Sequence, residues 1–253
     1  MGALIHYERL AVLFDYPEAD FPAQVRTLRE WLQSRYPDAA SRLESFAEAL
    51  PCSGASLSET ELDQVQEIFT RSFDVQAITT LGVGYVMFGD DYKRGELLVN
   101  LNREHRDAGI DCGSELSDHL PNVLRLIAKW QDPEIVMEFV EEILQPALDK
   151  MIGEFGADRM IQRNMLYRKH YKTLITSSVD RGTMYCDALQ GLLGVLKVDF
   201  DLREREYPEL KSDFLRSIGR EMEIESEELG PQQANPPPLS PAQQNLHQLR
   251  RVK

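Results

Sequence analysis

The spacing of apolar residues is the feature that most constrains how this chain can fold. Along most of the sequence they recur every three or four positions, as in the series Leu120, Val123, Leu124, Ile127 and Trp130. This period places the apolar side chains on one face of an α-helix. No segment alternates apolar and polar residues with a period of two, and no internal repeat is found. The pattern therefore predicts an all-α fold.

The same pattern, interrupted by prolines, glycines and capping residues, sets approximate helix boundaries. Ser58 and Glu61 have the spacing of a capping box and predict the start of one helix. Pro37 is expected to end another, because the residue before a proline avoids the helical conformation. We expect helices over residues 5–14, 21–36, 39–50, 58–73, 97–108, 120–130, 136–144, 159–176, 181–196 and 208–221.

The composition changes near residue 226. Beyond Gly230, prolines and glutamines replace most of the apolar residues. Such a segment buries too little apolar surface to fold by itself. We therefore expect a single globular multi-helix domain over residues 1–225. Residues 226–253 are expected to form a disordered C-terminal tail, acidic at its start and then rich in proline and glutamine.

The chain is strongly acidic, with 42 Asp and Glu residues against 28 Lys and Arg residues and a net charge of -14. This charge repels phosphate backbones and anionic membranes, and it attracts a basic peptide or a basic protein surface. The least polar run, residues 81–89, is far shorter than the ~20 residues that a membrane-spanning helix needs. We expect no nucleic-acid partner and no membrane insertion. Acidity that serves only solubility is the simpler alternative.

The cysteines indicate the redox compartment. Cys52, Cys112 and Cys186 lie far apart and form no C-x-x-C pair. This spacing indicates neither a disulfide framework nor a zinc knuckle, and it suits a reducing environment. The first residues also lack the basic and apolar regions of a secretory signal. We therefore expect a cytoplasmic protein.

One set of potential metal ligands has a regular spacing. His105, Cys112 and His119 follow one another at intervals of seven. Gly109 and Gly113, however, interrupt any helix that would align them on one face. We therefore predict no metal site and no other cofactor.

The polar stretch Glu115–Pro121 gathers two carboxylates, an imidazole and a proline at the start of the predicted helix 120–130. Backbone N–H groups are unpaired at such a position. Ser117 or Asp118 could serve as the N-cap. His119 could act as a general base oriented by Asp118 or Glu115, although adjacent helical residues point about 100° apart. The stretch could also bind a cationic peptide.

Arg94 precedes this stretch and has several potential roles. It could pair with Asp90, Asp91 or Glu115, and it could also be an isolated, solvated charge. The sequence alone leaves these alternatives open.

Aromatic and glycine residues accompany each other between positions 82 and 92. Tyr85, Phe88 and Tyr92 are more typical of a core than of a ligand contact. Gly82 and Gly84 lack the remaining residues of a phosphate-binding loop, so we predict no nucleotide site there. They would allow another backbone to approach closely.

The order of several motifs resembles that of a known family. Glu115-Leu116-Ser117-Asp118-His119-Leu120-Pro121 is similar to the Glu-(Leu/Pro)-x-Asp-His-(Leu/Ile)-Pro signature of the cytosolic redox-enzyme maturation chaperones. That family includes the nitrate reductase delta subunit (NarJ), TorD and DmsD. The similarity extends roughly from Leu10 to Leu148. Upstream segments that agree in order are Leu13–Pro17, Phe73-Asp74, Asp91–Gly95 and Ala108-Gly109.

The resemblance implies an all-helical domain of the TorD-like type and a non-enzymatic function. Members bind the N-terminal, leader-like peptide of the catalytic subunit of a molybdenum-containing oxidoreductase, and they assist cofactor insertion and complex assembly in processes such as nitrate respiration. It further implies that Asp118 and His119 affect peptide binding most. Ser117 departs from the proline that is frequent at its position. The remaining residues of the expected peptide site are Glu115, Pro121, Tyr85 and Arg94.

The expected partner is thus an immature molybdoenzyme catalytic subunit with a basic N-terminal peptide, bound by a monomer or weak dimer. Two alternatives belong to other classes of protein. One is a helical, metal-dependent hydrolase that uses His119 as its base. The other is a stable accessory subunit of a redox complex. The sequence does not identify the client enzyme.

Overall fold

The computed structural model describes residues 4–52, 54–170, 182–203 and 218–220. Contacts divide the chain into two units, Met1–Ser217 and Ile218–Lys253. The second unit is described only over residues 218–220, which are helical. The predicted tail, residues 226–253, and most of the predicted helix 208–221 lie outside the described residues.

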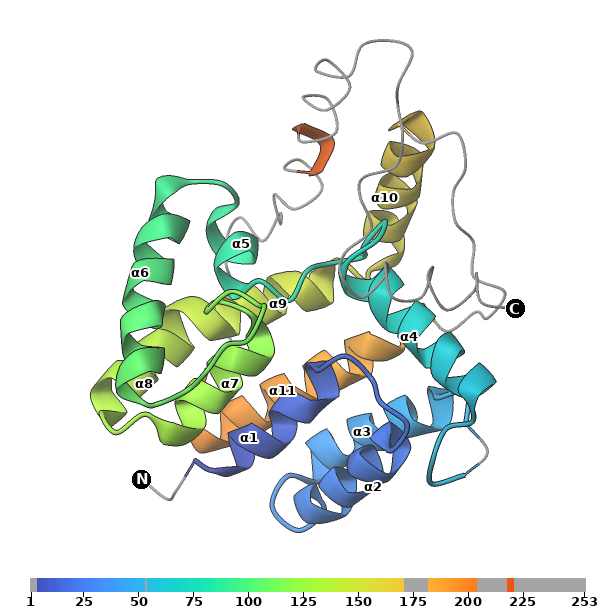
Figure 1. The fold of residues 1–253 in the computed structure, drawn as a ribbon, viewed down its shortest axis with the longest axis horizontal. Coiled ribbons are helices and arrows are strands. Elements are labelled where there is room, and N and C mark those ends of the chain that lie inside the picture. The colour runs from blue at the N-terminus through green and yellow to red at the C-terminus, as the bar shows by residue number, and fades with distance from the viewer. Residues whose placement is uncertain (1–3, 53, 171–181, 204–217, 221–253) are drawn as a thin grey trace. The chain divides into compact units, whose positions relative to one another are not determined.

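The described part of the first unit is built from helices, and no β-strand occurs within it (Figure 1). This confirms the all-α prediction. None of the helices described is both long enough and apolar enough to cross a membrane. The helices are α1 (His6–Ala11), α2 (Phe21–Leu32), α3 (Pro37–Ala49), α4 (Glu59–Phe73), α5 (Val83–Phe88), α6 (Tyr92–Asp107), α7 (Leu120–Lys129), α8 (Pro133–Phe139), α9 (Gln145–Gly153), α10 (Ala157–His170) and α11 (Met184–Asp199), with a 3₁₀ turn η1 (Val12–Phe14) and a π-helical turn η2 (Val140–Leu144).

Helix α11 forms the centre of the core. It packs mainly against α3 and also contacts α9, while α1 packs against α7. Gly191 allows α3 to lie close, because a Cβ atom at this position would be 2.6 Å from Cδ1 of Leu43. Most side chains of α11 are buried, as expected of a helix that is apolar on several faces.

Two helix starts follow directly from capping residues. The Ser58 hydroxyl accepts a hydrogen bond from the Glu61 backbone, and the Glu61 carboxylate accepts one from the Ser58 backbone at 2.9 Å. The predicted capping box is therefore confirmed. At the start of α8, the Asp132 carboxylate accepts hydrogen bonds from the backbone of Glu134 and Ile135.

Other predicted boundaries were wrong. Helix α2 ends at Leu32 instead of residue 36, and Pro37 starts α3 because its missing N–H costs nothing at a first helical position. Helix α6 begins five residues before the predicted start at Leu97, because the Asp91 side chain caps it by accepting from Lys93 N at 2.9 Å. Helix α5, Val83–Phe88, was not predicted.

A buried carboxylate ties the N-terminal helices to the end of α11. Asp199 accepts hydrogen bonds from the Tyr7 hydroxyl at 3.0 Å and the Tyr36 hydroxyl at 2.7 Å. It also lies 2.6 Å from His6 Nε2 and 3.0 Å from Arg35 Nη2. Burial raises the pKa of Asp199, but these hydrogen bonds outweigh it and hold the pKa below its ordinary value.

Candidate functional site

The loop before α7 is fixed to the segment before α5 by two backbone hydrogen bonds. Val83 N donates to the Asp118 carbonyl at 2.9 Å, and Leu120 N donates to the Leu81 carbonyl at 2.8 Å. These bonds form an isolated antiparallel bridge between Gly82 and His119. The bridge brings the Asp118-His119 pair next to the glycine-containing segment. Nothing in the sequence spacing indicated this contact.

Asp118 forms an ion pair with Arg94 of α6. Nε of Arg94 donates to Oδ2 of Asp118 at 3.1 Å. The Asp118 side chain is only 1% exposed and the Arg94 side chain 21%. None of the partners predicted for Arg94, namely Asp90, Asp91 and Glu115, is the observed one, and Arg94 is not a solvated charge. A buried carboxylate requires a cation nearby, whereas exposed acidic residues can remain in water.

The ion pair leaves part of the carboxylate unsatisfied. Oδ1 of Asp118 is buried and has no hydrogen-bond partner among the described residues. An unsatisfied buried acceptor of this kind typically costs about 1–3 kcal/mol. The Asp118 carboxylate can therefore accept a further hydrogen bond.

Tyr85 and Gly84 of α5 complete the surroundings of this ion pair. The guanidinium carbon of Arg94 lies 5.1 Å from the centroid of the Tyr85 ring, within the range of a cation–π interaction. A Cβ atom on Gly84 would lie 2.8 Å from Oδ2 of Asp118 and 3.1 Å from Cδ2 of Leu97. We expected Gly84 to admit another backbone, but it admits a carboxylate side chain.

The polar residues of the loop make tertiary contacts instead of capping α7. The N-cap position is occupied by His119, without a capping hydrogen bond, so the prediction of Ser117 or Asp118 was wrong. The Ser117 hydroxyl donates instead to the Leu98 carbonyl of α6 at 3.4 Å. Because these side chains are used to attach the loop to neighbouring helices, they cannot cap α7.

Asn122 fixes the shape of the loop from inside. Its side-chain amide donates to the carbonyls of Cys112 at 3.3 Å and Leu116 at 3.1 Å. Pro121 is buried in the first turn of α7. Sequence reasoning missed Asn122, and its position directly after Pro121 gave no signal of this role.

His119 is half-buried beside the ion pair. Burial lowers the pKa of His119 below its ordinary value, and the nearby carboxylates of Glu115 and Asp118 partly oppose this effect. No hydrogen bond joins the imidazole to Asp118 within the described residues. The arrangement therefore lacks the base–orienter bond that a catalytic His–Asp pair requires.

His105 has a different environment from His119. It is buried in α6, with Nδ1 2.8 Å from the Leu101 carbonyl and Nε2 3.2 Å from the Asn122 carbonyl. Burial raises the pKa of the Cys112 thiol, which disfavours the thiolate that binds metals. In the ranges that the structure describes, no group of three or more His, Cys, Asp or Glu side chains could hold a metal ion.

The structure brings three of the six predicted site residues together. Tyr85, Arg94 and Asp118 form one contiguous cluster, mostly below the surface. Glu115 is exposed, and its neighbour Leu116 is 54% exposed despite being apolar. The loop therefore presents Glu115 and Leu116 to solvent above a partly buried ion pair.

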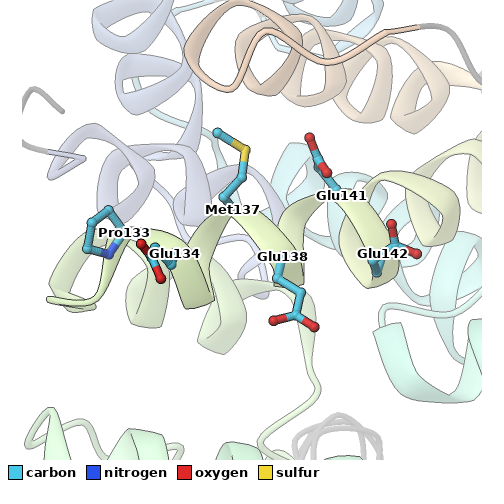
Figure 2. Close-up of a pocket in the computed structure, with 6 residues that line it drawn as sticks. All are labelled: Pro133, Glu134, Met137, Glu138, Glu141 and Glu142. Atoms are coloured by element: carbon cyan, nitrogen blue, oxygen red, sulfur yellow. The ribbon is translucent and has the colours of Figure 1, made fainter.

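Two of the grooves among the described residues of the first unit lie away from this loop, and neither is lined by Asp118 or His119. The larger, about 780 Å³, follows α8 and the π-helical turn (Figure 2). The smaller, about 540 Å³, follows α6 and includes Val99 and Tyr92. Tyr92 is 70% exposed, so its expected core position was wrong. The larger groove is lined by Pro133, Glu134, Met137, Glu138, Glu141 and Glu142.

Sequence reasoning also missed the larger groove. Its glutamates recur at helical spacing around Met137, which was a usable signal of an acidic helix face. Figure 2 shows Met137 and Glu141 directed to the same side of the helix, with Glu138 directed to the other.

No protein-family model matches this chain, and no curated protein is significantly similar to it. The resemblance to the redox-enzyme maturation chaperones therefore rests on the motifs quoted from the sequence.

Proposed function

We propose that this protein is a molecular chaperone for the immature catalytic subunit of a molybdenum-containing oxidoreductase. It binds the subunit's N-terminal, leader-like peptide in the cytoplasm and releases it once cofactor insertion and assembly are complete. One observation carries the proposal. Tyr85, Arg94 and Asp118, all predicted to belong to the peptide site, form a single cluster beneath the loop that bears Glu115 and His119.

The chemistry at the loop surface suits a peptide that is both basic and apolar. Leu116 offers exposed apolar surface beside the Glu115 carboxylate. The net charge of -14 attracts a cationic segment over a distance, which accelerates encounter more than it strengthens binding. Apolar contacts then supply affinity, and the carboxylate fixes the position of the basic residues.

The larger groove supports the same class of partner. Met137 is a flexible, polarizable side chain of the kind found at adaptable peptide-binding surfaces. Four glutamates line the same groove, and their carboxylates favour Arg or Lys in the bound segment. A π-helical turn adjoins this groove, and such turns are frequent at functional sites.

Calorimetric titration with a synthetic leader peptide of the client tests the proposal. We expect Glu115→Gln and His119→Ala to weaken binding by about tenfold or more, since each removes a polar contact worth about 1.5 kcal/mol. Glu48→Gln is the matched control, because Glu48 is an exposed glutamate on α3. Tight binding with an affinity that neither loop substitution changes would show that the loop is not part of the peptide site.

A pull-down experiment separates a chaperone from a stable accessory subunit. A chaperone associates only with the cofactor-free form of the catalytic subunit, because release follows cofactor insertion. Co-purification with the mature, cofactor-loaded enzyme would contradict the proposal.

A further inference from the structure

We propose that Asp118, Tyr85 and Gly84 form a guanidinium-binding site, which Arg94 of the same chain occupies in this structure. An arginine of the client peptide displaces Arg94 from it. The identity of the incoming arginine rests on the proposed function, whereas the guanidinium site itself does not.

The three residues supply the groups that recognise a guanidinium. Asp118 is a carboxylate removed from water, where a charge-assisted hydrogen bond is strong. The face of Tyr85 lies at cation–π distance from the bound guanidinium, with 5.1 Å between the guanidinium carbon and the ring centroid. Gly84 gives the carboxylate the space that it occupies, since a Cβ atom there would lie 2.8 Å from Oδ2 of Asp118.

Arg94 fills this site incompletely. It donates to Asp118 through Nε alone, and Oδ1 of the same carboxylate is buried without a partner. Its terminal Nη2 lies toward Gly82, 3.7 Å from the position of a Cβ atom on that residue. Among the described residues, neither Nη atom of Arg94 donates a hydrogen bond to this carboxylate. An arginine that enters from outside could donate two parallel N–H hydrogen bonds, one to each carboxylate oxygen.

Arg94 is more exposed than Asp118, so Arg94 is the partner that can leave the ion pair. Arg94 is 21% exposed and has a path into solvent, whereas Asp118 is 1% exposed. The carboxylate therefore becomes accessible only when Arg94 leaves. Lysine cannot replace arginine here, because an ammonium is a point charge that cannot form the bidentate pair. The site therefore selects arginine over lysine in the client peptide.

Chemical rescue tests the guanidinium site without any client. In the full-length Arg94→Ala chain, methylguanidinium should raise the melting temperature saturably, while methylammonium at equal ionic strength should not. The wild type and the double variant Arg94→Ala/Asp118→Asn should show no such rise. If Arg94→Ala does not fold, Arg94→Gln is used in the same way, because its shorter side chain carries no guanidinium. Equal responses to the two cations, or no response, would overturn the proposal.

Peptide titration tests the exchange. Arg94 competes with the client arginine, so the Arg94→Ala chain should bind an arginine-bearing leader peptide about tenfold more tightly than the wild type. The gain should vanish when lysine replaces arginine in the peptide. Equal gains for both peptides would overturn the exchange. If neither chain binds the peptide, the proposed function and the exchange both fail, while methylguanidinium rescue decides the guanidinium site separately.

Discussion

Asp118 determines the local geometry of the candidate site through three different contacts. Its carbonyl accepts from Val83, its carboxylate accepts from Arg94, and its side chain lies against Gly84. The sequence indicated Asp118 and Arg94 as site residues and Gly84 as a point of close approach. It could not predict that they meet, because Asp118 and Arg94 are 24 positions apart and an irregular loop separates Asp118 from the end of α6.

Gly84→Ala should destabilise the protein by about 1–3 kcal/mol, because the added methyl group would press into the Asp118 carboxylate and Leu97. Urea unfolding measures this change. Gly95→Ala is the matched control. Nothing lies within 4 Å of a Cβ atom at Gly95, and alanine in a helix interior is favoured over glycine by about 1 kcal/mol. Equal stabilisation by both substitutions would refute the close contact at Gly84.

At the scale of elements, the sequence predicted helix type well and helix ends less well. Periodicity identified α4 and α7, and the Ser58 capping box located the start of α4 within one residue. Periodicity is not sufficient where tertiary contacts decide. Residues 75–82 carry apolar side chains at helical spacing but form no helix, and the Leu81 carbonyl accepts a hydrogen bond from Leu120 N. A backbone group used in that contact is not available to a helix.

The packing of α3 on α11 depends on two glycines with different surroundings. A Cβ atom on Gly191 would lie 2.6 Å from Cδ1 of the fully buried Leu43, whereas one on Gly194 would lie 3.6 Å from Cβ of Ala39. Gly191→Ala should therefore be less stable than Gly194→Ala by about 1–3 kcal/mol, since a packed core must shift. Thermal unfolding compares the two variants, in which the same change from glycine to alanine alters helix propensity equally. A Gly191→Ala chain as stable as Gly194→Ala would contradict the close packing.

At the scale of the whole molecule, a network around Asp199 joins chain segments that are far apart in sequence. His6 and Asp199 are 193 positions apart, and Tyr36 contributes from between them. No local pattern in the sequence predicts such a contact. The overall acidity, by contrast, is visible in the composition and predicts the sign of the partner's charge.

The Asp199 network should make stability fall at both ends of the pH scale. The pKa of Asp199 is held below its ordinary value, so its contribution is present at neutral pH and is lost as the pH falls below about 4. Burial raises the pKa of Tyr7 and Tyr36, so their contribution is present below about pH 10 and is lost above it.

Urea midpoints measured across acid pH check this prediction. Asp199→Asn should flatten the acid part of the stability curve, whereas Asp107→Asn, an exposed acidic residue of α6, should leave its shape unchanged. Parallel acid curves for the wild type and Asp199→Asn would show that the carboxylate titrates as it does in the unfolded chain.

Amide hydrogen exchange of the full chain, with and without the client's leader peptide, tests the central claim of a peptide site at this loop most directly. We predict that bound peptide slows exchange in residues 112–122 and in the groove residues 133–142, and leaves α2 and α3 unchanged. Binding that protects other segments while residues 112–122 exchange at their free rate would contradict the claim.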